Sequence, residues 1–260
     1  MKRLIIALFV IAALSKCGTD QDKLSKVWFY ERTSGAAASS DTLLTPANFL
    51  SLRPDGSYTR DFGKFEYGTW KFEEGRLSLT NQRNRTVHLK ITFNTPNKIA
   101  IDLGNGKMAD FYGPGPLDPT TPEQDPFSKQ NNLWRIPATQ KETDEQLRQR
   151  LLNHCKFWEI YFDWGTKNDL RALDVRNIPT CVKIYGNGFG LKKWDDLPAA
   201  WKSYFYDEED CRKVDALIKH IFRHNDIDWP KSENKFVIFH GAFQQVQKLV
   251  AKTPFPALNP

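Results

Sequence analysis

Two patterns of apolar and polar positions divide the chain. From residue 24 to residue 113, apolar side chains alternate with polar ones in short segments, which is the period of a β-strand with one buried face. From residue 134 to residue 260 they recur every three to four positions, which is the period of an amphipathic helix. We therefore predict an α+β protein, with a small antiparallel β-barrel over 24–113 and a mainly α-helical domain over 134–260.

About eight short strands are predicted in the first of these domains. They are Val27–Tyr30, Phe49–Arg53, Ser57–Phe62, Tyr67–Phe72, Arg76–Thr80, Thr86–Phe93, Ile99–Leu103 and Met108–Tyr112. Tight-turn sequences separate them, among them Pro54-Asp55-Gly56 and Gly104-Asn105-Gly106. Connections this short join neighbouring antiparallel strands, and a meander of such strands can close into a barrel.

Three short motifs lie between residues 52 and 79: a D-G-x-Y turn, a G-x-W-K strand and a G-x-L-x-L strand. Their residues are Asp55, Gly56, Tyr58, Gly68, Trp70, Gly75, Leu77 and Leu79. This arrangement resembles the lipocalin-like domains of bacterial lipoproteins. The resemblance covers roughly residues 24–113 and implies a small barrel that binds an apolar ligand or serves as a docking module.

Six aromatic residues of the predicted barrel are candidates for ligand binding: Trp28, Tyr30, Phe49, Tyr58, Tyr67 and Trp70. Aromatic walls with a few polar groups are the usual lining of small-molecule sites. An eight-stranded barrel, however, has room only for its own side chains or for one small ligand. Short strands favour the filled barrel, and an aromatic pocket remains the alternative.

The helical domain is predicted from three apolar stripes. The first follows a capping box that begins at Thr139 or Thr143, and the second follows a cap at Asp207. The stripes are Leu147, Leu151, Cys155, Trp158 and Phe162; Val214, Leu217, Ile218, Ile221 and Phe222; and Phe236, Phe239, Phe243, Val246 and Val250. Phe236–Phe239 also fits a short strand, but the helical spacing continues beyond it. Shorter helices are predicted at Asp169–Val175 and Pro198–Tyr206.

A proline-rich linker is predicted over residues 114–133, between the two domains. Five prolines fall in this region, and proline removes a backbone donor and fixes φ, which disfavours both helix and sheet. The helical domain beyond it resembles the helical C-terminal portions of Bacteroidota lipoproteins, a resemblance that implies no particular activity.

The first residues predict a secreted, lipid-anchored protein. Lys2 and Arg3 precede an apolar run, Leu4–Leu14, of 11 residues. At ~1.5 Å per residue this run covers about half of a ~30 Å hydrocarbon layer, so it fits a signal peptide better than a membrane span. Leu14-Ser15-Lys16-Cys17 resembles the looser lipoboxes of Bacteroidota-type bacteria.

This resemblance implies a signal peptide over 1–16, lipidation at Cys17 and a polar tether over 17–23. It implies an outer-membrane lipoprotein of the cell envelope, on the periplasmic face or the cell surface, with the acyl chains holding it to the membrane. The alternative is an ordinary secreted chain with a cysteine near its end.

Charge and cysteine content exclude two other classes. The formal net charge is +6, and it falls to +3 without residues 1–16, which hold three Lys or Arg and no acid. That excess is too small and too dispersed for a nucleic-acid-binding face. Cys155, Cys181 and Cys211 allow at most one disulfide, so this is not a disulfide scaffold.

Several motifs that carry chemistry elsewhere have simpler explanations here. His220 and His224 have the i, i+4 spacing of zinc ligands but lack the glutamate of H-E-x-x-H. Adjacent His154 and Cys155 point about 100° apart on a helix, too far for a nucleophile–base pair. The glycine-rich segment 185–190 is expected to form a turn, and the acidic run 207–210 a helix start.

We therefore predict a non-enzymatic protein with no catalytic residues, no metal and no cofactor. Its expected partners are the membrane, through Cys17, and either a small apolar ligand of the barrel or an envelope protein. A structural or assembly role in an outer-membrane complex is the first alternative, and an envelope enzyme is the second.

Overall fold

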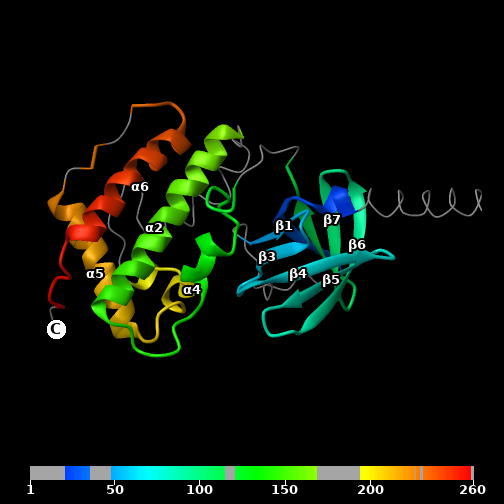
Figure 1. Cartoon of the computed structure of the whole chain (residues 1–260), viewed down its shortest axis with the longest axis horizontal. Coiled ribbons are helices and arrows are strands. Elements are labelled where there is room, and N and C mark those ends of the chain that lie inside the picture. Colours follow the sequence, from blue (N-terminus) through cyan, green and yellow to red (C-terminus); the bar gives the residue numbers. More distant parts are fainter. Residues whose placement is uncertain are drawn as a thin grey trace, which may run out of the picture. The chain divides into compact units, whose positions relative to one another are not determined.

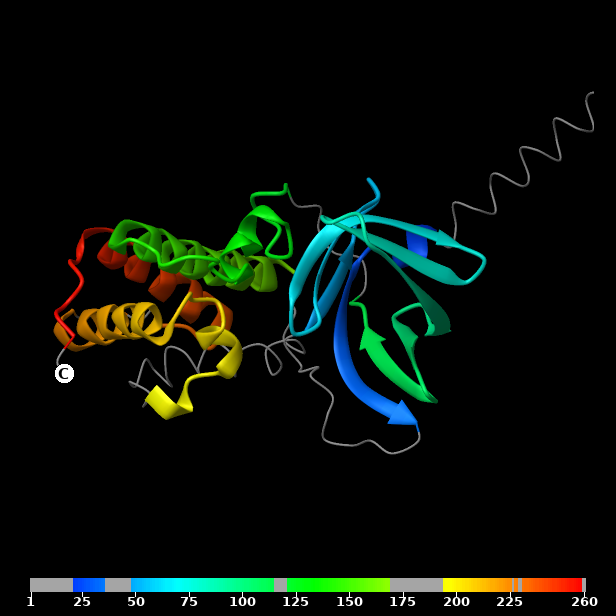
Figure 2. The same cartoon turned by 90° about the horizontal axis from the view of Figure 1, so that it is seen from below.

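The computed structural model describes residues 21–35, 48–114, 121–168, 194–225, 227–228 and 231–258. The chain divides into two compact units, Met1–Pro116 and Leu117–Pro260 (Figures 1 and 2). The predicted signal peptide, Cys17, Cys181, the helix at Asp169–Val175 and the glycine-rich segment 185–190 all lie outside the described residues.

In its described part, the first unit is a closed antiparallel barrel of eight strands. The strands are β1 (Val27–Gly35), β2 (Phe49–Leu52), β3 (Ser57–Asp61), β4 (Phe65–Glu73), β5 (Arg76–Asn81), β6 (Thr86–Thr95), β7 (Lys98–Gly104) and β8 (Lys107–Tyr112). Each strand pairs with the next in sequence, and β8 pairs with β1 to close the wall (Figure 2). The predicted fold class, with its N-terminal barrel, is confirmed.

The turn between β2 and β3 illustrates why the strands end where they do. Gly56 has a φ of 79°, a conformation that glycine adopts without steric cost. The Asp55 carboxylate accepts a hydrogen bond from the backbone N–H of Ser57 at 2.8 Å, which fixes the turn. The D-G motif therefore folds as a local unit that sets the β2–β3 register.

The second unit is helical in its described part. Its elements are the 3₁₀-helix η1 (Gln130–Arg135), α2 (Asp144–Lys167), the 3₁₀-helix η3 (Trp194–Asp196), α4 (Ala199–Lys202), α5 (Glu208–His224) and α6 (Lys235–Lys252). Helix α2 packs along α6 and also contacts η1 and α5 (Figure 1). Within the described residues, no helix combines the length and apolarity that a bilayer crossing demands.

The start of α2 follows the predicted capping box. The Thr143 hydroxyl accepts from the backbone N–H of Gln146, and the Gln146 side chain accepts from the backbone N–H of Thr143. These two bonds satisfy donors that a helix N-terminus otherwise leaves unpaired. The box therefore begins at Thr143 and not at Thr139.

The predicted apolar stripes form the core of the helical unit. All five residues of the α2 stripe are buried, as are four residues of the α6 stripe. Phe162 lies at the centre of this contact, with its ring centroid 5.7, 5.0 and 6.0 Å from those of Phe236, Phe239 and Phe243. Rings at these separations add favourable stacking and edge contacts to the burial itself.

Part of the predicted linker over 114–133 is folded into the helical unit. The Phe127 ring is buried and its centroid lies 5.1 Å from that of Trp164. The buried Asn132 amide donates to two backbone carbonyls of the preceding loop, at 2.7 and 2.8 Å. Prolines prevent regular secondary structure in this loop, and asparagine side-chain amides supply hydrogen bonds to its backbone carbonyls instead. The segment from residue 121 is therefore packed structure.

We expect Gly165→Ala to destabilise the helical unit by about 1–2 kcal/mol, although alanine is the better helix former. A Cβ atom at Gly165 would lie 2.4 Å from a ring carbon of Phe236, which is buried and held by α2. Urea unfolding followed by circular dichroism at 222 nm measures the change. In a Phe236→Leu background the same substitution should be neutral or stabilising. If Gly165→Ala instead stabilised the protein that retains Phe236, this result would contradict the packing described.

Candidate functional site

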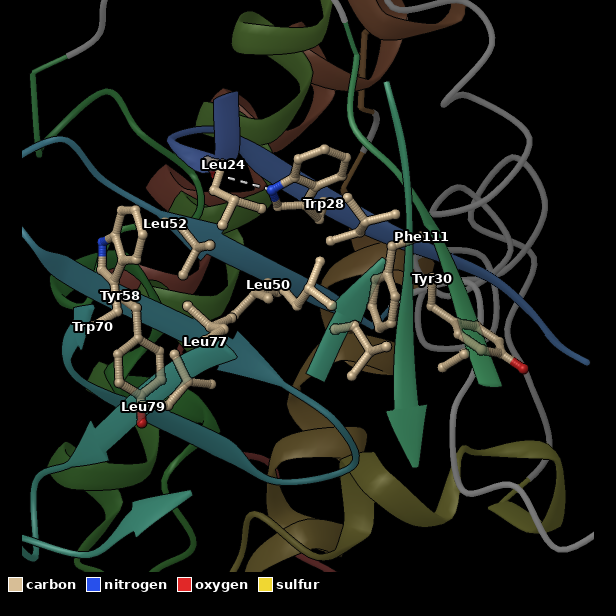
Figure 3. Packing of buried hydrophobic residues seen from close by; sticks show 14 residues of the cluster. Leu24, Trp28, Tyr30, Leu50, Leu52, Tyr58, Trp70, Leu77, Leu79 and Phe111 are labelled. Atoms are coloured by element: carbon tan, nitrogen blue, oxygen red, sulfur yellow. Dashed lines mark hydrogen bonds between the residues drawn. The ribbon is translucent and has the colours of Figure 1, made fainter. Parts of the chain in front are cut away.

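The interior of the barrel is the region where the sequence places most of the candidate residues. Side chains from all eight strands and from Leu24 meet there in one apolar cluster (Figure 3). Its members are Leu24, Trp28, Tyr30, Leu50, Leu52, Tyr58, Trp70, Leu77, Leu79, Ile91, Ile99, Ile101, Ala109 and Phe111, none more than 6% exposed. The inner face is therefore a packed core made of the barrel's own side chains.

The two interior indoles have their polar atoms satisfied by the barrel itself. Trp28 Nε1 donates to the backbone carbonyl of Leu24 at 3.0 Å, and Trp70 Nε1 donates to that of Arg53 at 2.9 Å. Leu24 belongs to a short helical turn at residues 21–24, which packs its side chain into the barrel core. Both bonds hold large rings in fixed positions and leave neither N–H available to a ligand.

Of the six predicted ligand-binding aromatics, four share the interior and two do not. Trp28, Tyr30, Tyr58 and Trp70 belong to the interior cluster. Phe49 precedes the inward-facing Leu50 on β2, so it points to the opposite face, where it is also buried.

Tyr67 is three positions from the inward-facing Trp70 on β4, and an odd separation along a strand places it on the outward face. Its ring centroid is 6.1 Å from that of Phe65. The structure therefore does not bring the six aromatics to one site.

Tyr58 differs from the other polar side chains of this interior cluster in the state of its hydroxyl group. Its hydroxyl is buried and has no hydrogen-bond partner among the described residues. Burial raises the pKa of the Tyr58 phenol, with the nearby Glu66 carboxylate adding to the effect and Arg60 opposing it. A buried hydroxyl without a partner costs free energy, and it is the best-placed group in the barrel to hydrogen-bond a guest molecule.

Tyr58 is followed on the inner face by a half-buried ion pair, which the sequence reasoning missed. Arg60 Nε donates to Glu66 Oε2 at 3.0 Å, and the two residues are register partners on β3 and β4. The guanidinium also lies over the Phe62 ring, 5.3 Å from its centroid. The sequence does contain a signal for this pair. Arg60 is two positions from Tyr58 and Glu66 is four positions from Trp70, so strand alternation places both on the inner face.

The described histidine and cysteine candidates lie on two helices, His154 and Cys155 on α2 and Cys211, His220 and His224 on α5. The rings of His220 and His224 lie with centroids 4.6 Å apart on α5. Among the described residues, no three His, Cys, Asp or Glu side chains are grouped as metal ligands. Burial raises the pKa of the Cys211 thiol to about 12, so the thiol stays protonated at neutral pH, and Cys155 is buried within the α2 stripe.

His154 is a core residue of the helical unit. Trp158 Nε1 donates to its Nε2 at 2.9 Å, and its ring centroid lies 4.4 Å from that of Trp134. Burial lowers the pKa of His154 well below its usual value, and the positive charge of Arg135 lowers it further. The imidazole is therefore neutral in the folded protein and serves as an acceptor in an aromatic core.

This buried histidine predicts a specific pH dependence of stability. Below about pH 6.5 the unfolded chain binds a proton at this position that the folded chain does not, so stability falls as pH falls. We expect the loss from His154 to be about 1.4 kcal/mol between pH 7.5 and pH 5.5. Urea unfolding at both pH values, followed at 222 nm, should show that His154→Gln lacks this part of the loss. Equal losses of stability between pH 7.5 and pH 5.5 in the wild-type protein and in His154→Gln would contradict the assignment of this pH dependence to His154.

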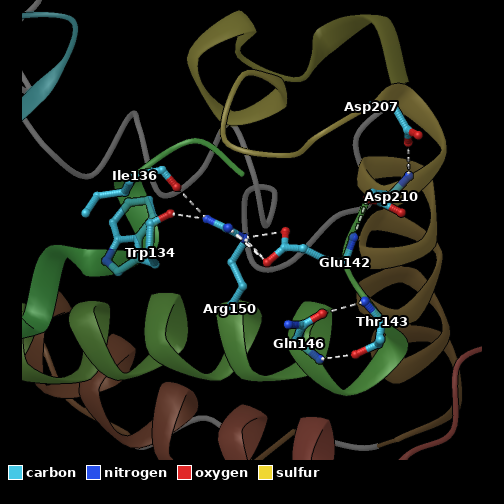
Figure 4. A network of polar contacts seen from close by, with 8 residues as sticks. All are labelled: Trp134, Ile136, Glu142, Thr143, Gln146, Arg150, Asp207 and Asp210. Carbon is cyan, nitrogen blue, oxygen red and sulfur yellow. Dashed lines mark hydrogen bonds and ion pairs between the residues drawn. The ribbon is translucent and has the colours of Figure 1, made fainter. Parts of the chain in front are cut away.

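The acidic run 207–210 forms the start of α5. The Asp207 carboxylate accepts from the backbone N–H of Asp210 at 2.9 Å, as an N-cap does. Asp210 is buried and accepts from the backbone N–H of Glu142 at 3.2 Å (Figure 4). Burial raises the pKa of the Asp210 carboxyl, and these acids have structural roles at a helix end.

Comparisons of this chain with protein-family models, with curated proteins and with solved structures found no match.

Proposed function

We propose that this chain is a lipid-anchored, non-enzymatic protein of a bacterial cell envelope, and that its lipocalin-like barrel is a docking module. The anchor is the acylated Cys17, which would hold the protein on the outer membrane after removal of residues 1–16. A docking module binds its partner through its outer surface and therefore needs a rigid interior. The filled core of the barrel is the single observation that carries this proposal.

The packing of the core favours docking over transport of a ligand. Ligand pockets of soluble proteins enclose several hundred Å³, whereas the inner positions of this barrel are occupied by Trp28, Trp70, Tyr58 and the leucines around them. Both indole N–H groups are satisfied internally. A guest of comparable size would have to displace these side chains and break those bonds.

The state of the Cys211 thiol and the His154 imidazole supports a non-enzymatic role. General acid–base and nucleophilic catalysis use groups that are accessible and have a pKa near neutrality. Cys211 and His154 are both buried, with their pKa values shifted away from neutrality in the directions that keep them uncharged.

A small apolar ligand is the second candidate, and two observations favour it. The Tyr58 hydroxyl has no partner among the described residues. Val87 and Phe93 carry side chains on the inner face of β6 that remain 40% and 36% exposed, so the inner surface is not closed along its whole length. An apolar molecule would cover these side chains at the strand ends.

Native mass spectrometry of the full chain, purified from membranes in a non-ionic detergent, distinguishes the two candidates. The docking proposal predicts the mass of the acylated polypeptide without a further lipid, and no affinity for an apolar dye. A stoichiometric lipid adduct or dye binding with micromolar affinity would favour the ligand carrier and contradict the filled module. Leu79→Ala is the positive control, because it opens a dry cavity among core side chains of the size that binds benzene, so benzene binding should appear in this variant.

A further inference from the structure

The β5–β6 hairpin of the barrel is paired on only one side over the first half of β6. Strand β5 pairs with residues 86–90 of β6 along one edge. On the other edge, pairing with β7 begins only at Ile91, which lies opposite Ile101. In the part of the chain that the structure describes, residues 86–90 therefore have a strand partner on the β5 side and none on the β7 side. This second side is the open edge of β6.

The backbone groups on the open edge can be identified from the alternation along β6. The backbone N–H of Ile91 donates to the Gly75 carbonyl at 3.2 Å, so the backbone of Ile91 faces the β5 side. Successive residues of a strand direct their N–H and C=O groups to opposite edges. The backbone groups of Thr86, His88 and Lys90 therefore face the open edge, where they form a template for a further strand.

The same hairpin carries an unbalanced charge. From Arg76 to Thr95 the sequence contains four Lys or Arg residues, Arg76, Arg83, Arg85 and Lys90, and no acid. All four side chains are exposed, and among the described residues none of them takes part in an ion pair. Arg76 and Lys90 are also register partners, and like charges in directly opposite positions destabilise a sheet. Carboxylates from another molecule would remove this repulsion.

Apolar side chains also remain exposed beside the open edge. Val87 on β6 is 40% exposed, and Leu103 on the neighbouring β7 is 44% exposed. An exposed edge of this kind is prone to pair with a second copy of the chain, and charged side chains on the edge oppose such pairing. Two copies joined here would place the cations of both hairpins side by side. The charge therefore disfavours a second copy and favours an acidic partner.

We propose that the open edge of β6 binds an extended, acidic segment of another protein, which adds to the barrel as a further strand. The ladder bonds come from the backbone groups of Thr86, His88 and Lys90. Carboxylates of the segment neutralise Arg85 and Lys90, and an apolar side chain at an alternate position covers Val87. A phospholipid has negative charge but no peptide groups, so the unpaired ladder favours a polypeptide. This surface rests on the proposed role of the barrel as a docking module and defines the chemistry of its partner.

Fluorescence anisotropy of a labelled heptapeptide, titrated with the full chain in a non-ionic detergent, tests the proposal. The probe has the sequence Glu-Glu-Val-Glu-Val-Glu-Glu. We expect saturable binding at about 50 mM salt that weakens several-fold at about 200 mM, because exposed charges are screened. N-methylation of the peptide nitrogens keeps the charge of the probe and removes its ladder donors, so the affinity should fall about ten-fold.

Two matched double variants locate the contact. Arg85→Gln with Lys90→Gln removes two cations beside the open edge and should weaken binding about five-fold. Lys248→Gln with Lys252→Gln removes two exposed cations of α6 and should leave the affinity unchanged. Amide hydrogen exchange of residues 86–92 should be slower in the complex than in the free chain. Circular dichroism verifies that each variant keeps its fold.

Several results would overturn the proposal. They are the absence of saturable binding, equal binding of the N-methylated probe or of a probe with Lys in place of Glu, and equal binding by the variant that lacks Arg85 and Lys90. A dimer in the native mass spectrum with protected hairpin amides would assign the open edge to a second copy and would also overturn it. The mass of the acylated chain without a further lipid tests the docking module independently of this probe, so the two proposals can fail separately.

Discussion

Trp28→Ala is expected to lower the unfolding free energy of the barrel by about 3–5 kcal/mol. The indole is fully buried in the interior cluster, and its Nε1 donates to the Leu24 carbonyl at 3.0 Å (Figure 3). Alanine removes the ring, leaves a cavity among leucines and frees the turn at residues 21–24. Amide hydrogen exchange followed by mass spectrometry measures the loss, because it reports peptides of the barrel and of the helical unit separately.

Two control variants separate the contributions of this tryptophan. Trp28→Phe keeps most of the apolar volume and loses the hydrogen bond, so we expect a smaller loss, of about 1–2 kcal/mol. Val87→Ala removes an exposed side chain of the same barrel and should cost less than about 1 kcal/mol. A similar loss from Trp28→Ala and Val87→Ala would contradict the assignment of Trp28 to the core.

The second large effect is expected at Arg150, which joins α2 to the segment that precedes it (Figure 4). Its guanidinium pairs with both Glu142 oxygens, at 2.9 Å from Nε and from Nη2, and donates to the backbone carbonyls of Trp134 and Ile136 at 2.8 and 3.0 Å. The side chains of Arg150 and Glu142 are only 12% and 13% exposed. Arg150→Met leaves a carboxylate and two carbonyls without this donor, so we expect a loss of about 3–5 kcal/mol.

A double-mutant cycle tests whether the ion pair itself carries this loss. Glu142→Leu combined with Arg150→Met should be less destabilising than the sum of the two single variants, by about 1–3 kcal/mol. Lys167→Met is the matched control on the same helix, because its pair with Asp163 is largely exposed and should contribute less than about 1 kcal/mol. Urea unfolding followed by circular dichroism at 222 nm measures the loss of stability in the two single variants, the double variant and the control. If the loss of stability in the double variant equalled the sum of the two single losses, the two side chains would not be coupled.

The sequence predicted those parts of the fold that depend on local patterns. Eight alternating segments and the turn residues between them specify an antiparallel meander, and the structure closes it as β1 to β8. The α2 stripe from Leu147 to Phe162 and the capping box at Thr143 are likewise local, and both are confirmed. These signals need no knowledge of the partner strand or helix.

The remainder depends on contacts between distant residues. The four residues of β2 are all buried, so the sequence could not show that Leu50 faces inward and Phe49 outward. Asn132 holds the loop before it, although a proline-rich composition indicates an open linker. The bonds from Arg150 to Glu142 and to two carbonyls follow from the tertiary structure and have no local signature.

Metabolic labelling with radioactive palmitate in a bacterial host, followed by separation of membrane and soluble fractions, tests the proposed anchor most directly. The wild-type chain should carry label and sediment with the membranes, and the Cys17→Ser variant should carry none and lose its membrane association. Unlabelled wild-type protein, or a Cys17→Ser variant that stays with the membranes to the same extent, would contradict the proposed envelope lipoprotein.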